Sequence, residues 1–189
     1  MPPVELDALR NLPTDDQQVF LLGRILSETT RLDGMLRLLH SALRNEREGL
    51  DMLALYDSPD SFAKSATECL HLIDQRDGLD HATRAALQAS VVAARAAYKR
   101  RNRFVHDLLR EDFLNRGWWE LSRMQRRAGE IEPETEILTF DDVVHVVLDL
   151  VAAVWRLRGA SLFVISGRWE AYAVGEVEGH WDGTATASR

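Results

Sequence analysis

The sequence predicts a mainly α protein: an antiparallel bundle of four to five helices, with a small β-hairpin inserted before the last main helix. Three observations predict this fold. One apolar stripe, with steps of three and four residues, runs from Leu22 to Leu43, and a second runs from Val143 to Leu157. Such spacing puts apolar residues on one face of a helix. Between the two stripes, residues 135–140 have the composition of a β-strand.

Length and composition indicate one soluble domain. The chain of 189 residues can bury a core of its own, and its 46% hydrophobic and 28% charged content is ordinary. We divide it into an N-terminal arm (1–13), a helical bundle (14–165, hairpin at about 117–140) and a poorly ordered C-terminal tail (166–189). The single cysteine, Cys69, excludes an internal disulfide and a cysteine-based zinc site.

Neither a targeting signal nor a membrane span is expected. The first residues, Met-Pro-Pro-Val-Glu, carry no basic region and no apolar run. The most apolar segment, residues 143–165, is interrupted by His145, Asp149, Arg156 and Arg158. We therefore expect a cytoplasmic protein.

The helix boundaries follow from capping residues. Thr14 opens the first helix, and Gln17, three residues on, is read as its capping-box partner. A second, shorter helix starts at residues 58–60 and ends near Ile73. A third runs over residues 80–111. After a turn at 128–130, Thr139 or Asp141 caps the last helix, which continues beyond Gly159.

The third predicted helix carries the chemically distinctive residues. Its stripe consists of Leu87, Val91, Ala94, Tyr98, Val105 and Leu108. Arg101 fills the one step of seven in this stripe, where a guanidinium is unfavourable unless it is paired or lines a polar cleft. Asn102 and His106 are four residues apart and share a helix face. Arg101, Asn102 and His106 are therefore the candidate catalytic residues.

The order Arg-Asn-x-x-x-His near the end of a long helix resembles the signature of the HEPN superfamily. These are all-α proteins in which an Arg, four to six residues and a His form a metal-independent ribonuclease site. Asn102 occupies the position where a polar residue commonly follows the Arg. The same spacing recurs from Arg76 to His81, within a Gly- and Asp-rich connection, and we interpret that copy as a chance match. The resemblance covers about residues 14–165.

The resemblance implies a metal-independent endoribonuclease without a cofactor, active in toxin–antitoxin or antiphage defence. RNA supplies its own nucleophile, the 2′-OH, and the product would be a 2′,3′-cyclic phosphate. His106 would act as the acid–base group, Arg101 would stabilise the charge on the phosphoryl oxygens, and Asn102 would position the phosphate.

The same resemblance implies partners. Nucleases of this superfamily generally assemble their cleft between two protomers, so a homodimer with the third helix at or near the interface is expected, with a possible antitoxin protein. In one subgroup a Tyr two residues after the His is modified by the antitoxin. Leu108 occupies that position here, so control through such a tyrosine is not expected.

Charge is unevenly distributed. The net charge is −7, yet residues 95–127 hold ten basic and four acidic residues, which gives this segment +6 and the remainder −13. A basic segment of this kind is what an RNA-binding surface needs. The predicted RNA-binding residues are Lys99, Arg100, Arg103, Arg126 and Arg127. Trp118 and Trp119 could stack on unpaired bases, although Trp119 is the better candidate for the core.

Other interpretations remain open. The basic residues could form a solvated face paired with acids of neighbouring helices, and the protein could be a HEPN-like module that binds RNA or protein without cleaving, or a structural bundle subunit. Glu68 and His71 have the Glu-x-x-His spacing of iron-binding bundles, but a metal site is disfavoured, and His71 is read as half-buried. Glu28 is read as an unpaired surface charge rather than as a partner of Arg101.

Overall fold

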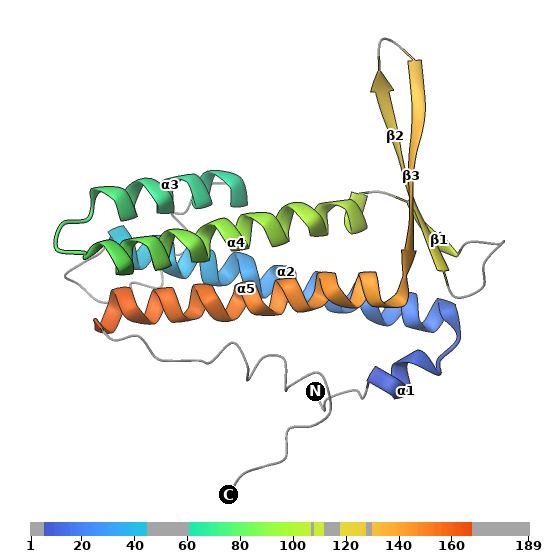
Figure 1. Cartoon of the computed structure of the whole chain (residues 1–189), viewed down its shortest axis with the longest axis horizontal. Coiled ribbons are helices and arrows are strands. Elements are labelled where there is room, and N and C mark those ends of the chain that lie inside the picture. Colours follow the sequence, from blue (N-terminus) through green and yellow to red (C-terminus); the bar gives the residue numbers. More distant parts are fainter. Residues whose placement is uncertain (1–5, 45–60, 107, 112–117, 128–129, 168–189) are drawn as a thin grey trace, which may run out of the picture.

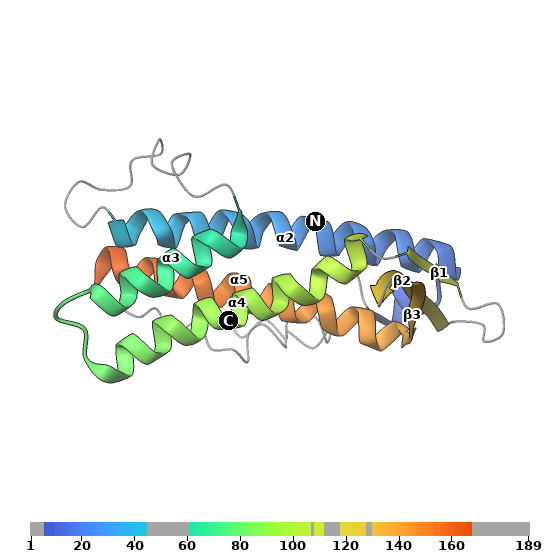
Figure 2. The ribbon, with the colours of Figure 1, turned by 90° about the horizontal axis from the view of Figure 1, so that it is seen from above.

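Two long helices, α2 (Thr14–Arg44) and α5 (Phe140–Ser166), lie side by side along the length of the molecule. In the computed structural model, which describes residues 6–44, 61–106, 108–111, 118–127 and 130–167, two further helices pack on this pair. They are α3 (Phe62–Gln75) and α4 (His81–His106), which run antiparallel and form the second layer seen in Figures 1 and 2. The predicted helical bundle is confirmed.

A three-stranded antiparallel sheet precedes α5. Its strands are β1 (Leu108–Glu111), β2 (Trp118–Arg127) and β3 (Glu130–Thr139), in the order β1-β2-β3. The predicted hairpin at about 117–140 corresponds to β2 and β3. The prediction that the third helix extends to Glu111 is wrong, because residues 108–111 pair with residues 119–122 of β2. This long-range pairing overrides the local helical pattern.

The buried faces of the helices agree largely with the sequence periodicity. Leu87, Val91 and Ala94 of α4 are buried, and so are all residues of the predicted α5 stripe, which are Val143, Val147, Leu150, Val154 and Leu157. Further along α4 the buried stripe shifts by one position, to Ala97 and Phe104, and Val105 is 36% exposed. The two positions are again seven residues apart, so the spacing alone does not distinguish the observed stripe from the predicted one at Tyr98 and Val105.

Polar contacts fix the ends of the helices. Thr139 caps α5: its hydroxyl accepts from the Asp142 backbone N–H (3.2 Å), while the Asp142 carboxylate accepts from the Thr139 backbone N–H (2.8 Å). The N-cap of α3 is Ser61, and the predicted start at 58–60 lies outside the described residues. The Arg84 guanidinium of α4 donates to the carbonyls of Asp74 (2.6 Å) and Arg76 (2.9 Å), which closes the end of α3.

The predicted N-terminal arm contains a short helix, α1 (Leu6–Arg10), whose Leu9 is buried. The Gln17 side chain donates to the carbonyls of Arg10 (2.9 Å) and Leu12 (2.8 Å), so this residue ties α1 to α2 instead of completing the predicted capping box. Residues 1–5 and the predicted tail from residue 168 onward lie outside the described part of the chain. None of the described helices is long and apolar enough to cross a membrane.

The capping box of α5 yields a first prediction. Thr139→Ala removes the hydroxyl acceptor and should lower the free energy of unfolding by about 1 kcal/mol, measured by urea denaturation near neutral pH. Thr30→Ala is the matched control, because the exposed Thr30 hydroxyl only donates to the carbonyl of Leu26 within its own helix. Equal losses in the two variants would contradict a specific capping role.

The capping contribution should also depend on pH. Hydrogen bonds from the Thr139 hydroxyl and backbone N–H lower the pKa of Asp142 from its ordinary value. The contribution is therefore complete above the pKa of an unfolded Asp, about 3.9, and is lost as the pH falls through the lower pKa of the folded state. Asp142→Asn should flatten this acid dependence in the same denaturation experiment.

Candidate functional site at the end of α4

Arg101 lies near the end of α4, where this helix meets α2. Its Nε–H donates to the Thr29 hydroxyl of α2 (3.1 Å), and one terminal nitrogen donates to Asn102 Oδ1 (2.9 Å). The Tyr98 ring lies one turn earlier, with its centroid 5.3 Å from the guanidinium carbon. The half-buried guanidinium is thus held by an inter-helix hydrogen bond, a neighbouring amide and an aromatic face.

No carboxylate among the described residues pairs with Arg101; both of its described hydrogen-bond partners are neutral. The Thr29 hydroxyl can accept from Arg101 because its own proton is donated to the Ile25 carbonyl (2.6 Å). An arginine has five N–H donors, and these contacts use two of them. A partly desolvated positive charge with donors to spare favours an anionic ligand.

Asn102 and His106 complete the predicted set, and the structure describes them to different extents. Asn102 is half-buried and contacts Arg101 through its amide oxygen. The backbone of His106 forms the last residue of α4, one turn after Asn102, so the two positions share a helix face. The His106 side chain lies outside the described residues. Arg101 and Asn102 are therefore in contact, and His106 occupies the adjoining turn.

The predicted RNA-binding residues fall into three groups. Lys99 is exposed. Arg100 pairs with Asp149 of α5 (2.9 Å), and Arg103 pairs with Glu136 of β3. Arg126 and Arg127 lie on β2 and their side chains are outside the described residues, but the strand register sets Arg127 opposite Glu130 and Arg126 opposite Ile131.

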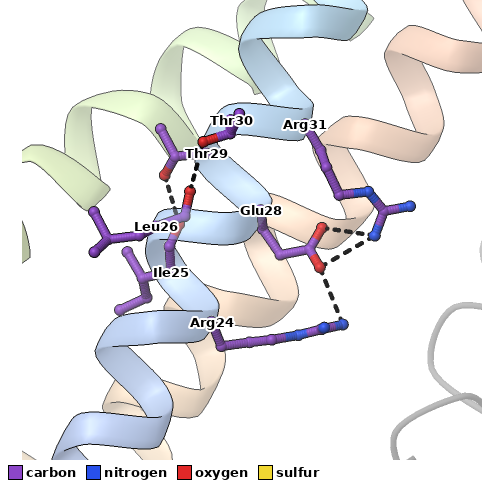
Figure 3. Close-up of polar contacts among 7 residues, drawn as sticks. All are labelled: Arg24, Ile25, Leu26, Glu28, Thr29, Thr30 and Arg31. Carbon is purple, nitrogen blue, oxygen red and sulfur yellow. Dashed lines mark hydrogen bonds and ion pairs between the residues drawn. The ribbon is translucent and has the colours of Figure 1, made fainter. Parts of the chain in front are cut away.

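Glu28 is not the unpaired surface charge that the sequence suggested; that reading is wrong. Its side chain is fully buried, and its carboxylate pairs with Arg24 (3.0 Å) and Arg31 (3.1 Å) of the same helix (Figure 3). The neighbouring Thr29 points to the other side, toward α4. The signal available in the sequence was the spacing of the two arginines, four residues before and three after Glu28, which brings all three onto one helix face.

In the Glu-x-x-His pair of α3, which was considered above as a possible iron site, the glutamate contacts a histidine of α2. Glu68 Oε2 lies 2.8 Å from Nε2 of the buried His40 of α2, while His71 is exposed rather than half-buried. No group of three or more potential metal-binding side chains occurs within the part of the chain that the structure describes. Next to Glu68, burial raises the pKa of the Cys69 thiol to about 12, which makes it unreactive at neutral pH.

Two residues of the site, Tyr98 and Thr29, escaped the sequence reasoning. Tyr98 was assigned only to the apolar stripe of the third predicted helix, although its ring faces Arg101. Thr29 lies within the predicted stripe from Leu22 to Leu43 and was given no other role, although it accepts a hydrogen bond from Arg101. A threonine in an otherwise apolar stripe was the available signal, because a buried hydroxyl needs a partner.

Comparison of the chain with known protein families, with curated proteins and with solved structures finds no match. The functional inference therefore rests on the residues around Arg101 themselves.

Glu28 provides a second prediction. Glu28→Gln removes the buried carboxylate between two arginines and should lower the free energy of unfolding by about 1–3 kcal/mol, since both guanidinium groups still reach water. Asp33→Asn is the matched control: Asp33 pairs with Arg37 at the surface (2.9 Å), and its loss should cost no more than about 0.5 kcal/mol. Chemical denaturation of both variants measures the difference, and a Glu28→Gln effect as small as the control would rule out a stabilising role.

Proposed function

We propose that this protein is a metal-independent endoribonuclease of HEPN type that acts in the cytoplasm, with a role in toxin–antitoxin or antiphage defence. The observation that supports it best is the half-buried Arg101, held by Thr29 and Asn102 without a described carboxylate partner, five residues before His106 on α4. A purely structural arginine at such a place is usually neutralised by an acid.

The free donors of Arg101 suit a phosphodiester. A guanidinium fixed by two hydrogen bonds and an aromatic ring needs little reorganisation to bind the two non-bridging oxygens of a phosphate. Because negative charge builds on these oxygens during cleavage, the interaction is stronger in the transition state than in the ground state. Asn102 holds the guanidinium from its own helix and can position the phosphate with its amide N–H groups.

Cleavage then needs one proton acceptor and one proton donor. In the proposed reaction His106 takes the proton of the 2′-OH, the 2′ oxygen bonds to phosphorus, and the bond from phosphorus to the 5′ oxygen breaks. The leaving oxygen takes up a proton, and the products are a 2′,3′-cyclic phosphate and a 5′-hydroxyl end. An imidazole suits both steps at neutral pH because its ordinary pKa is about 6.5.

A homodimer would supply the second acid–base group, since each protomer carries one Arg101, Asn102 and His106. Apolar residues exposed on α2 and α4 support an interface on this part of the molecule. Val19 is 72% exposed, Leu26 is 48% exposed, and Val105 is one residue before His106. An antitoxin is the second proposed partner, without tyrosine modification, because Leu108 stands at that position.

The second candidate is a HEPN-like module that binds RNA or protein without cleaving. The ion pairs Arg100–Asp149 and Arg103–Glu136 favour it, because they neutralise two of the basic residues expected to hold RNA. The net charge of −7 acts in the same direction.

The third prediction separates these candidates. The purified protein should cleave labelled RNA in the presence of EDTA, and His106→Ala and Arg101→Ala should each reduce the rate at least about 100-fold. His81→Ala, in the chance copy of the motif, is the matched control and should leave the rate unchanged. Identical circular-dichroism spectra would show that the variants fold. Cleavage that persists in His106→Ala would place the activity elsewhere, and RNA binding without cleavage would favour the second candidate.

The fourth prediction concerns the surface that binds RNA. Lys99→Glu should weaken RNA binding and reduce the slope of log K against log salt by about one unit, because one phosphate contact is lost. Arg126→Glu with Arg127→Glu should weaken binding in the same way if the hairpin faces RNA. Unchanged affinity and slope in the double variant would restrict the hairpin to a structural role.

A further inference from the structure

Helix α3 begins close to the candidate site. It runs away from the end of α4 that carries Arg101, so its first turn is the part of α3 nearest to that residue (Figures 1 and 2). Phe62 is the first residue of α3 and follows the N-cap Ser61. Its side chain is 5% exposed, although it stands at a helix end. A large apolar side chain buried at such a place packs on a specific neighbour.

That neighbour is Tyr98 of α4. The two rings are stacked, with 5° between their planes and 4.0 Å between their centroids. A parallel ring at this distance covers one face of the Tyr98 ring. The guanidinium carbon of Arg101 also lies over this ring, 5.3 Å from its centroid, and therefore occupies the other face. The Tyr98 ring is thus held between Phe62 on one side and Arg101 on the other.

The stack limits the motion of the group that supports Arg101. A tyrosine side chain turns about two torsions, and a ring free to turn would give the guanidinium a moving partner. Phe62 opposes this motion, because turning the Tyr98 ring breaks the stack. The hydrogen bonds of Arg101 to Thr29 (3.1 Å) and Asn102 (2.9 Å) are then made against a fixed surface.

Phe62 also anchors the first half of α3. The buried residues that follow it on the packing face of this helix are small: Ser65, Ala66 and Cys69. The next large side chain that is fully buried belongs to Ile73, near the other end of α3. The position of the first turn of α3 and the orientation of the Tyr98 ring therefore depend on each other.

We propose that Phe62 is a positioning residue of the candidate site. Through the Tyr98 ring it holds the Arg101 guanidinium in the orientation in which its remaining donors bind an anionic ligand. Helix α3 is thereby part of the site without contacting the ligand, and a shift of its first turn would loosen Arg101. The consequence for RNA cleavage rests on the proposed function, whereas the effect on the guanidinium does not.

The exchange of the Arg101 Nε–H with water tests this inference without RNA. In a heteronuclear NMR spectrum this group gives one signal, assigned through its absence in Arg101→Lys, and its hydrogen bond to the buried Thr29 slows exchange. Phe62→Ala should speed the exchange at least about threefold, because the stack that fixes Tyr98 is lost.

Ile73→Ala is the matched control, because it removes a large buried side chain from the other end of the same helix. It should lower the stability of the protein as any such cavity does, yet change the exchange rate less than about twofold. Equal exchange rates in Phe62→Ala and the wild-type chain would overturn the proposal, and so would equal acceleration in the two variants.

Substitutions of Tyr98 separate positioning from a direct chemical role. Tyr98→Phe keeps the ring and the stack and should leave RNA cleavage within about twofold of the wild-type rate, whereas Tyr98→Leu should lower kcat about tenfold with a smaller change in KM. Equal losses in both variants would assign the effect to the hydroxyl and contradict the positioning role. A wild-type chain that does not cleave RNA would count against the proposed function, while the exchange measurement would still decide the role of Phe62.

Discussion

The packing of α2 against α5 is the interaction on which the rest of the structure depends. Both helices are buried along most of their length by stripes with helical spacing, and every other element contacts this pair directly or through a neighbour. Because α4 packs on both helices, the pair determines which residues of α4 lie next to α2. It thereby sets up the hydrogen bond between Arg101 and Thr29. Because α5 begins directly at the end of β3, the same pair also determines where the β2–β3 hairpin leaves the bundle.

The sequence predicted the fold class, a cap of α5 at Thr139 or Asp141 and most buried positions, because these follow from local periodicity and capping chemistry. It did not predict that residues 108–111 form a strand, since that outcome depends on pairing with β2. It also placed Glu28 on the surface, because a single acidic residue gives no sign of burial until its arginine neighbours are considered. At the candidate site, Arg101 and Asn102 could be selected by spacing, whereas Thr29 comes from a helix 72 residues away in sequence.

Two arginines in this protein illustrate opposite uses of the same side chain. Arg84 donates to backbone carbonyls at the end of α3, where the helix dipole places negative partial charge, and its charge is used within the fold. Arg101 contacts a hydroxyl and an amide, which orient it without neutralising it. The difference lies in the partners and not in burial alone, and it separates a structural guanidinium from one available to a ligand.

The separation of α2 and α5 along the chain affects how the protein is made. Helices α3 and α4 are joined by a short connection and can pair soon after they leave the ribosome, whereas the apolar stripe of α2 has no lengthwise partner until α5 emerges, roughly a hundred residues later. At typical rates of about 5–20 residues per second this delay lasts roughly 5–20 s. During that interval the face of α2 that later packs on α5 stays exposed on the nascent chain, where a co-translational chaperone can bind it.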